Sequence, residues 1–180
     1  LLSSTEGLEL GNSLFLLSQD RNLQVFSISR KLPPSGGAGI SIFRAGVDNI
    51  LSISSNEQNL GNIGYNDFFG MLSFGVQLNQ HSSIGFNVKS LFQNFKISDN
   101  EKYSSKGIAF DFGFYVTPIK GISFGAKIEN LSAKYNWNEN ISDDSQNYEE
   151  IIPSRLLIGS SYSFEDILLL TIQHEIILIS

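Results

Sequence analysis

The chain has no cysteine, few charged residues and no long apolar run. Without cysteine it can have no disulfide framework, no thiolate metal site and no cysteine nucleophile. Charged residues make up 17% of the chain, against about 25% in ordinary soluble domains. No stretch approaches the roughly 18 consecutive apolar residues of a transmembrane helix. If the chain crosses a membrane, it must therefore do so as a β-barrel.

Basic residues are also scarce. Lys and Arg total 12 against 18 Asp and Glu, which gives a formal net charge of -6. Binding to nucleic acid normally needs a basic face that neutralises phosphates. We therefore expect no nucleic-acid partner.

Aromatic residues, in contrast, are abundant, at 12% with 14 Phe, and apolar residues alternate with small or polar ones along most of the chain. This period of two is typical of β-strands with two different faces. It is clearest at residues 68–78, 84–92, 108–116 and 122–128, and weaker at 23–32, 37–46, 155–164 and 167–177. The sequence thus predicts an all-β domain of about eight antiparallel strands. Residues 1–21 stay uncertain, with a strand near 14–19 as one interpretation.

The predicted linkers alternate between short and long. Residues 33–36, 80–82, 118–120 and 165–166 form the short linkers, whereas 47–66, 97–105 and 132–153 form the long ones. Short turns then fall on one rim and long loops on the other, as in outer-membrane barrels with short periplasmic turns. We therefore predict an up-and-down transmembrane β-barrel in a bacterial outer membrane, in contact with membrane lipid and lipopolysaccharide, with its long loops outside the cell.

Tyrosine and tryptophan lie at different positions along the predicted strands from phenylalanine and isoleucine. Phe and Ile fill the middles of the predicted strands, while every Tyr and the only Trp lie near strand ends: Tyr65, Tyr103, Tyr115, Tyr135, Trp137, Tyr148 and Tyr162. Tyr and Trp favour the half-wet depth of a membrane interface. We expect two aromatic girdles around an apolar band.

A soluble β-sandwich binding module is the alternative fold, because it also alternates and uses polar turns. Its solvent face should be dense in Lys, Glu and Thr. The non-apolar positions here are mostly Gly, Ser, Asn and Gln, with the charges concentrated in the predicted loops. This composition favours the barrel.

Several segments together resemble one known family. They are residues 39–50 (GISIFRAGVDNI), 72–75 with 84–89, 107–113 with Tyr115 and Pro118, 122–131, and 152–155 with Gly159. In order and spacing they resemble the PorV/PorQ-like family over about residues 23–165. The resemblance implies a fatty-acid-transporter-like barrel of about fourteen strands, some members of which serve type IX secretion. It also implies that residues 1–180 are a single barrel domain that is incomplete at both ends.

No residue pattern points to catalysis or to a cofactor. His81 lies in a short turn, and His174 lies beside Glu175 in an apolar run, without the spacing of a catalytic arrangement. We therefore expect no enzyme activity, and the resemblance carries no catalytic motif.

The loops hold the remaining polar candidates. The carboxylates of Asp143, Asp144, Glu149 and Glu150 would suit calcium, but EF-hand spacing is absent, so a solvated acidic loop is the simpler interpretation. We take Asp48, Asp143, Asp144 and Trp137 as candidate outer-loop contacts.

Three charged residues share the lumen-facing parity of their strands: Lys89, Asp111 and Lys127. Counting outward from the short turns places them at one level, with Asp111 and Lys127 near cross-strand neighbours. Charges facing lipid are costly, whereas charges in a lumen can pair. We predict a structural ion-pair layer, and the alternatives are a polar ligand site or a register altered by a bulge.

Two functions from different classes remain. In one, the barrel docks secreted proteins or secretion subunits through its long outer loops, as the resemblance implies. In the other, it transports small hydrophobic molecules through its lumen. The predicted lumen face is polar and small, which favours docking, although fold analogy alone establishes neither.

Overall fold

A computed structural model describes residues 7–18, 20–53, 59–96, 102–138, 147–164 and 167–178. These residues form strands and short connections, and none forms a helix long and apolar enough to cross a membrane. The strands are β1 (Leu8–Leu17), β2 (Arg21–Leu32), β3 (Gly36–Ile53), β4 (Asn59–Asn79), β5 (Ser82–Lys96), β6 (Lys102–Ile119), β7 (Ile122–Asn138), β8 (Asn147–Ile151), β9 (Ser154–Phe164) and β10 (Leu168–Leu178).

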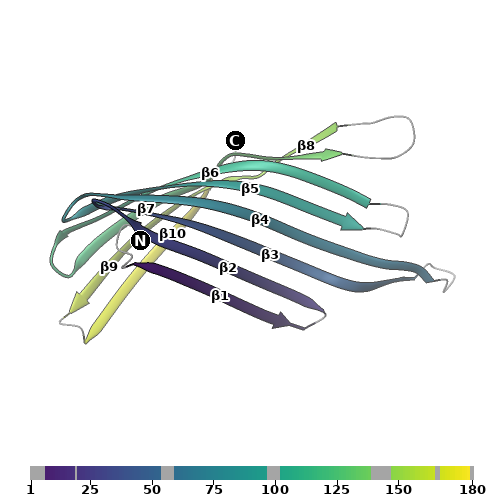
Figure 1. The fold of residues 1–180 in the computed structure, drawn as a ribbon, viewed down its shortest axis with the longest axis horizontal. Helices are drawn as coiled ribbons and strands as arrows, with labels where there is room; N and C mark the ends of the chain where they lie inside the picture. The colour runs from purple at the N-terminus through teal and green to yellow at the C-terminus, as the bar shows by residue number, and fades with distance from the viewer. Residues whose placement is uncertain are drawn as a thin grey trace.

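All ten strands belong to one antiparallel sheet, in the order β1-β2-β3-β4-β5-β6-β7-β9-β10. The short β8 pairs with the end of β7 beyond the part of β7 that pairs with β9. Figure 1 shows the sheet as one curved layer with β1 and β10 at its two edges. The all-β, antiparallel up-and-down fold is therefore confirmed, as an open sheet over the described residues. The expected number of strands was too low, because β8 was not predicted and the strand near residues 14–19, which overlaps β1, was not counted among the eight.

The long loops were predicted with the wrong bounds. β3 and β4, with 18 and 21 residues, continue through most of residues 47–66. β5, β6 and β7 likewise extend into two other expected loops, and β8 lies inside the third. The apolar alternation stops in these extensions, but strand pairing does not need it, because backbone hydrogen bonds form the ladder.

The two faces of the sheet differ sharply. On the concave face, the buried side chains include small or polar ones, Ser73, Ser83 and Asp111, and an apolar cluster of Leu91, Ala109, Ala133 and Tyr135. On the convex face, large apolar side chains are exposed, and Phe112, next to Asp111 in β6, is 51% exposed against 1% for Asp111. The convex rings still contact each other, with the centroids of Phe86 and Phe112 4.8 Å apart. The period of two in the sequence thus separates two surfaces with different surroundings.

β7 departs from regular pairing with β6 at two places. Phe112 pairs with Ile128, Phe110 with Leu131, and Ile108 with Lys134, so β7 has an extra residue in each interval. Asn130 and Ser132 take up these bulges with φ values of 58° and 54°. Two bulges in succession restore the alternation, so Ala133, Tyr135 and Trp137 return to the concave face.

Candidate functional site on the concave face

Asp111 in β6 is the centre of a charged cluster on the concave face. Its carboxylate lies 2.8 Å from Lys89 Nζ of β5 and 3.7 Å from Lys127 Nζ of β7. The structure therefore brings together the three residues that the sequence singled out. Asp111 is 1% exposed and Lys89 is 12% exposed, so this pair is largely withdrawn from solvent.

The sequence predicted that the three residues lie at one level of the sheet, and this prediction was wrong. Asp111 lies opposite Asn87, Lys89 lies opposite Ala109, and Lys127 lies opposite Gly113. The charges are thus staggered diagonally, because Lys89 and Lys127 lie opposite β6 positions two residues away from Asp111 on either side. Long lysine side chains bridge such diagonal positions.

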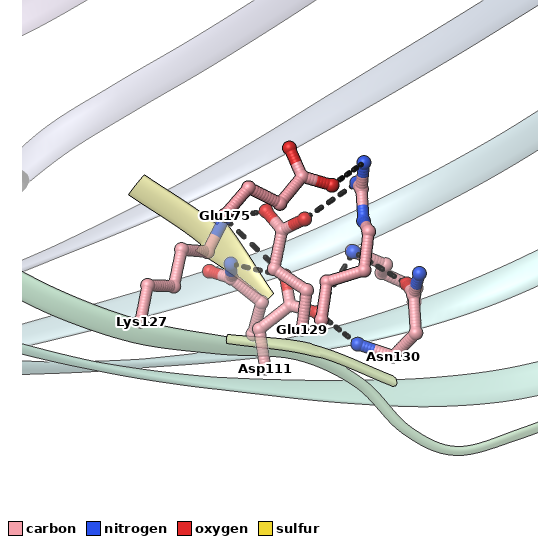
Figure 2. A network of polar contacts seen from close by, with 8 residues as sticks. Asp111, Lys127, Glu129, Asn130 and Glu175 are labelled. Carbon is pink, nitrogen blue, oxygen red and sulfur yellow. Dashed lines mark hydrogen bonds and ion pairs between the residues drawn. The ribbon is translucent and has the colours of Figure 1, made fainter. Parts of the chain in front are cut away.

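The cluster continues across two further strands. Lys127 Nζ lies 2.5 Å from Glu129 Oε1, Arg155 Nη2 of β9 lies 2.6 Å from Glu129 Oε2, and Arg155 Nη1 lies 3.3 Å from Glu175 Oε1 of β10. Figure 2 shows Asp111, Lys127, Glu129 and Glu175 converging on one network. We call the whole set the charge ladder: Lys89, Asp111, Lys127, Glu129, Arg155 and Glu175.

The sequence analysis missed half of the charge ladder. Glu129 follows Lys127 at the same parity, so alternation was a usable signal for its face. Arg155 and Glu175 lie on strands that follow a long connection. Their contacts depend on the register of β9 against β7 and β10, which local sequence does not encode.

Hydrogen bonds complete the surroundings of Asp111. The Asn130 amide donates to Oδ1 at 3.1 Å, and Asn87 Nδ2 donates to Oδ2 at 2.9 Å. Lys89 Nζ also donates to Asn130 Oδ1 at 3.2 Å. Asp111 therefore supplies an acceptor for a backbone amide at the β7 bulge as well as charge for two lysines. A buried carboxylate needs such partners to remain ionised.

The charge ladder alternates acids and bases along its length, and each acid contacts at least one base. No group of three or more His, Cys, Asp or Glu within the described residues is placed to hold a metal ion. The arrangement suits mutual neutralisation, and its geometry links five adjacent strands, β5, β6, β7, β9 and β10.

A second group of concave side chains lies at the end of the sheet away from the short turns. Gln93 Nε2 donates to Tyr65 Oη at 3.0 Å, Tyr135 Oη donates to Asp67 Oδ1 at 3.5 Å, and Trp137 Nε1 donates to Glu150 Oε2 at 2.9 Å. We call this group the inner rim: Tyr65, Asp67, Gln93, Tyr135, Trp137, Tyr148 and Glu150. Cross-strand pairing places Tyr103 on the same face, opposite Phe95.

The inner rim corrects the expectation of a lipid-facing girdle at this end of the sheet. Tyr135 is buried, and its ring centroid lies 6.3 Å from that of Trp137. The convex positions beside them carry Lys106, Lys134 and Asn136 instead. The sequence located these aromatic residues near one rim, and Tyr135 and Trp137 have the same parity as Lys127 and Glu129, so alternation was a usable signal for the concave face.

The four candidate outer-loop contacts lie in different parts of the chain. Trp137 belongs to the inner rim, whereas Asp143 and Asp144 lie outside the described residues. Asp48 lies within the backbone of β3. Glu149 and Glu150 point to opposite faces, with Glu149 3.0 Å from Lys134 Nζ, so these two do not converge on a common calcium ion.

The two histidines are far apart. His81 lies in the turn between β4 and β5, where its amide donates to Asn79 Oδ1 at 2.8 Å. His174 lies in β10 opposite Ile158, on the convex face. Neither contacts a serine or carboxylate in the described part of the chain.

Comparisons with known proteins add no relative. No protein-family model matches the chain, no curated protein matches it, and no solved structure matches it.

Proposed function

We propose that the chain forms part of the wall of an outer-membrane β-barrel that docks secreted proteins or secretion subunits at its outer rim. The observation that carries this proposal is the contrast between the sheet's two faces. A continuous exposed apolar surface needs a cover, and a membrane supplies one. Buried polar and charged residues on the other face suit a lumen.

The dimensions of the apolar surface support a membrane position. In β6 the convex residues from Ile108 to Val116 are all apolar, and at about 3.3 Å per residue they extend for about 26 Å. A strand tilt of about 40° would reduce this to about 20 Å along the membrane normal, near the roughly 25 Å apolar band of such barrels. Lys106 follows directly on the convex face, where a polar boundary is expected.

The inner rim supports docking. Tyr and Trp are enriched in protein interfaces because they supply large rigid contact areas with a polar tip. Asp67 and Glu150 have no basic partner among the described residues, in contrast to the acids of the charge ladder. This rim lies toward the side on which we place the cell exterior. The resemblance to the PorV/PorQ-like family makes a type IX-like secretion role our specific proposal.

Transport of hydrophobic molecules is supported less well. The charge ladder lies across the concave face between the inner rim and the short turns. An apolar molecule that passed along this wall would have to displace water from charged groups without offering them any partner, which is unfavourable.

The test uses the intact protein in its native bacterium. Replacing Trp137 by p-benzoyl-phenylalanine and irradiating live cells should crosslink the protein to secreted proteins or secretion subunits. The matched control carries the same group at Lys120, in the turn at the opposite rim. Equal crosslinking from both positions, or crosslinking from Lys120 alone, would contradict docking at the inner rim. Recovery of the protein in the aqueous fraction without detergent would contradict its membrane position.

A further inference from the structure

A hollow of about 470 Å³ opens on the convex face where the apolar surface ends. Phe92 and Ile108 form its apolar side, and Lys106, Lys134, Ser90 and Ser132 supply its polar groups. It lies over β5, β6 and β7, on the opposite side of the sheet from the inner rim. We call it the convex hollow.

One of the β7 bulges borders this hollow. Ser132, with φ 54°, is an extra residue between the positions paired with Phe110 and Ile108, and its side chain is exposed on the convex face. The β7 backbone there approaches β6 so closely that a Cβ atom at Gly107 would lie 2.1 Å from the Lys134 carbonyl oxygen. Only glycine fits at position 107 without moving β7.

The charged side chains at the hollow, two lysines and the Glu149 that pairs with one of them, have a net positive charge. Lys106 has no ion pair or hydrogen bond with any described residue, so its ammonium group is available. Lys134 pairs with Glu149 at 3.0 Å, but both side chains are about half exposed, and such exposed pairs are weak. Two ammonium groups, two hydroxyl groups and an adjacent apolar wall suit a phosphate attached to an acyl chain.

We propose that the convex hollow binds the phosphate group of an anionic lipid in the membrane leaflet next to the inner rim. The lipid phosphate lies between Lys106 and Lys134, accepts hydrogen bonds from Ser90 and Ser132, and directs its acyl chain along Phe92 and Ile108. This inference rests on the proposed membrane position of the chain. It commits to a lipid and not to free phosphate, because the apolar side of the hollow continues into the apolar surface.

The test is native mass spectrometry of the purified full chain released from detergent micelles. Dioleoyl phosphatidic acid and dioleoylglycerol are the probes, since they differ only in the phosphate, and inorganic phosphate is the third arm. We expect a one-to-one adduct with phosphatidic acid, and much weaker binding of dioleoylglycerol and inorganic phosphate. Equal binding of the two lipids would overturn the site. Inorganic phosphate binding as tightly as phosphatidic acid would overturn the role of the acyl chain.

Variants sharpen the test. Lys106→Gln and Lys134→Gln should each weaken phosphatidic acid binding about fivefold, the equivalent of about 1 kcal/mol per basic residue at a membrane surface. Lys120→Gln, at the opposite rim, should change nothing. Glu149→Gln should tighten binding because it removes the carboxylate that competes for Lys134, whereas Glu150→Gln, on the other face, should not. An equal effect of Lys120→Gln and Lys106→Gln would overturn the site.

Fractionation of cells separates this inference from the proposed function. If the chain sediments with outer membranes and Lys106→Gln binds phosphatidic acid like the unaltered chain, only the lipid site fails. If the unaltered chain is absent from the membrane fraction, the proposed function fails first.

Discussion

At the scale of single residues, Asp111 is the position where most of the concave-face chemistry meets. Its carboxylate contacts Lys89 and Lys127, and it accepts hydrogen bonds from Asn87 and from the Asn130 amide at the β7 bulge. Replacing the carboxylate would leave a lysine charge uncompensated in a nearly buried position. Removing one partner of a buried ion pair lowers the free energy of unfolding, because the remaining charge stays desolvated.

We therefore expect Asp111→Asn to destabilise the folded chain by about 3 kcal/mol. Folded barrels migrate differently from unfolded ones on unheated gels, so the temperature at which the folded band disappears provides the measurement. Glu149→Gln is the control, because it breaks an exposed ion pair worth at most about 1 kcal/mol. A folded band equally heat-resistant in the Asp111 variant and the unaltered chain would show that the charge ladder has no bracing role.

At the scale of one element, neighbouring residues of β6 alternate between the apolar convex face and the polar concave face. Phe112 lies near the middle of its convex apolar residues and contacts the Phe86 ring of β5. If the convex face lies in a membrane as proposed, Phe112→Arg should reduce the free energy of folding into the membrane by about 2 to 4 kcal/mol, because arginine near the middle of the membrane is poorly solvated. Gln77→Arg, on the concave face of β4, should be tolerated. Assembly is measured as the fraction of chain that folds into lipid vesicles, and equal tolerance of both changes would argue against a membrane around the convex face.

At the scale of the whole molecule, the proposal fixes which end of the sheet faces the cell exterior. The inner rim and Tyr148, which is 67% exposed, lie at one end, and the turn containing Lys120 lies at the other. Because the chain has no cysteine, Tyr148→Cys and Lys120→Cys each introduce a unique thiol. A membrane-impermeant maleimide applied to intact cells should label Tyr148→Cys and leave Lys120→Cys unlabelled until the cells are broken. Labelling of Lys120→Cys alone would reverse the orientation.

Much of the fold could be predicted because alternation is a local property. Phe112 and Phe124 belong to the apolar parity of residues 108–116 and 122–128 and lie exposed on the convex face, and Lys89, Asp111 and Lys127 were expected on the other face and meet there. β8 was missed, and β1 was foreseen only as one interpretation of residues 1–21, for different reasons. β1 is exposed throughout, so no buried face shaped its sequence, and β8 is too short for a period to stand out.

By itself, the sequence determined the strand class, the antiparallel order and the face of each residue up to the middle of β7, because side chains alternate wherever the backbone stays extended. Only the tertiary structure decided what lies beyond Asn130. Two bulges there shift the register of β7 against β6 by two residues and bring the Lys134 carbonyl close to Gly107, while the parity of Tyr135 and Trp137 stays that of Lys127. The tertiary structure also brought Arg155 and Glu175 to Glu129, since contacts between strands distant in sequence depend on the registers of the whole sheet.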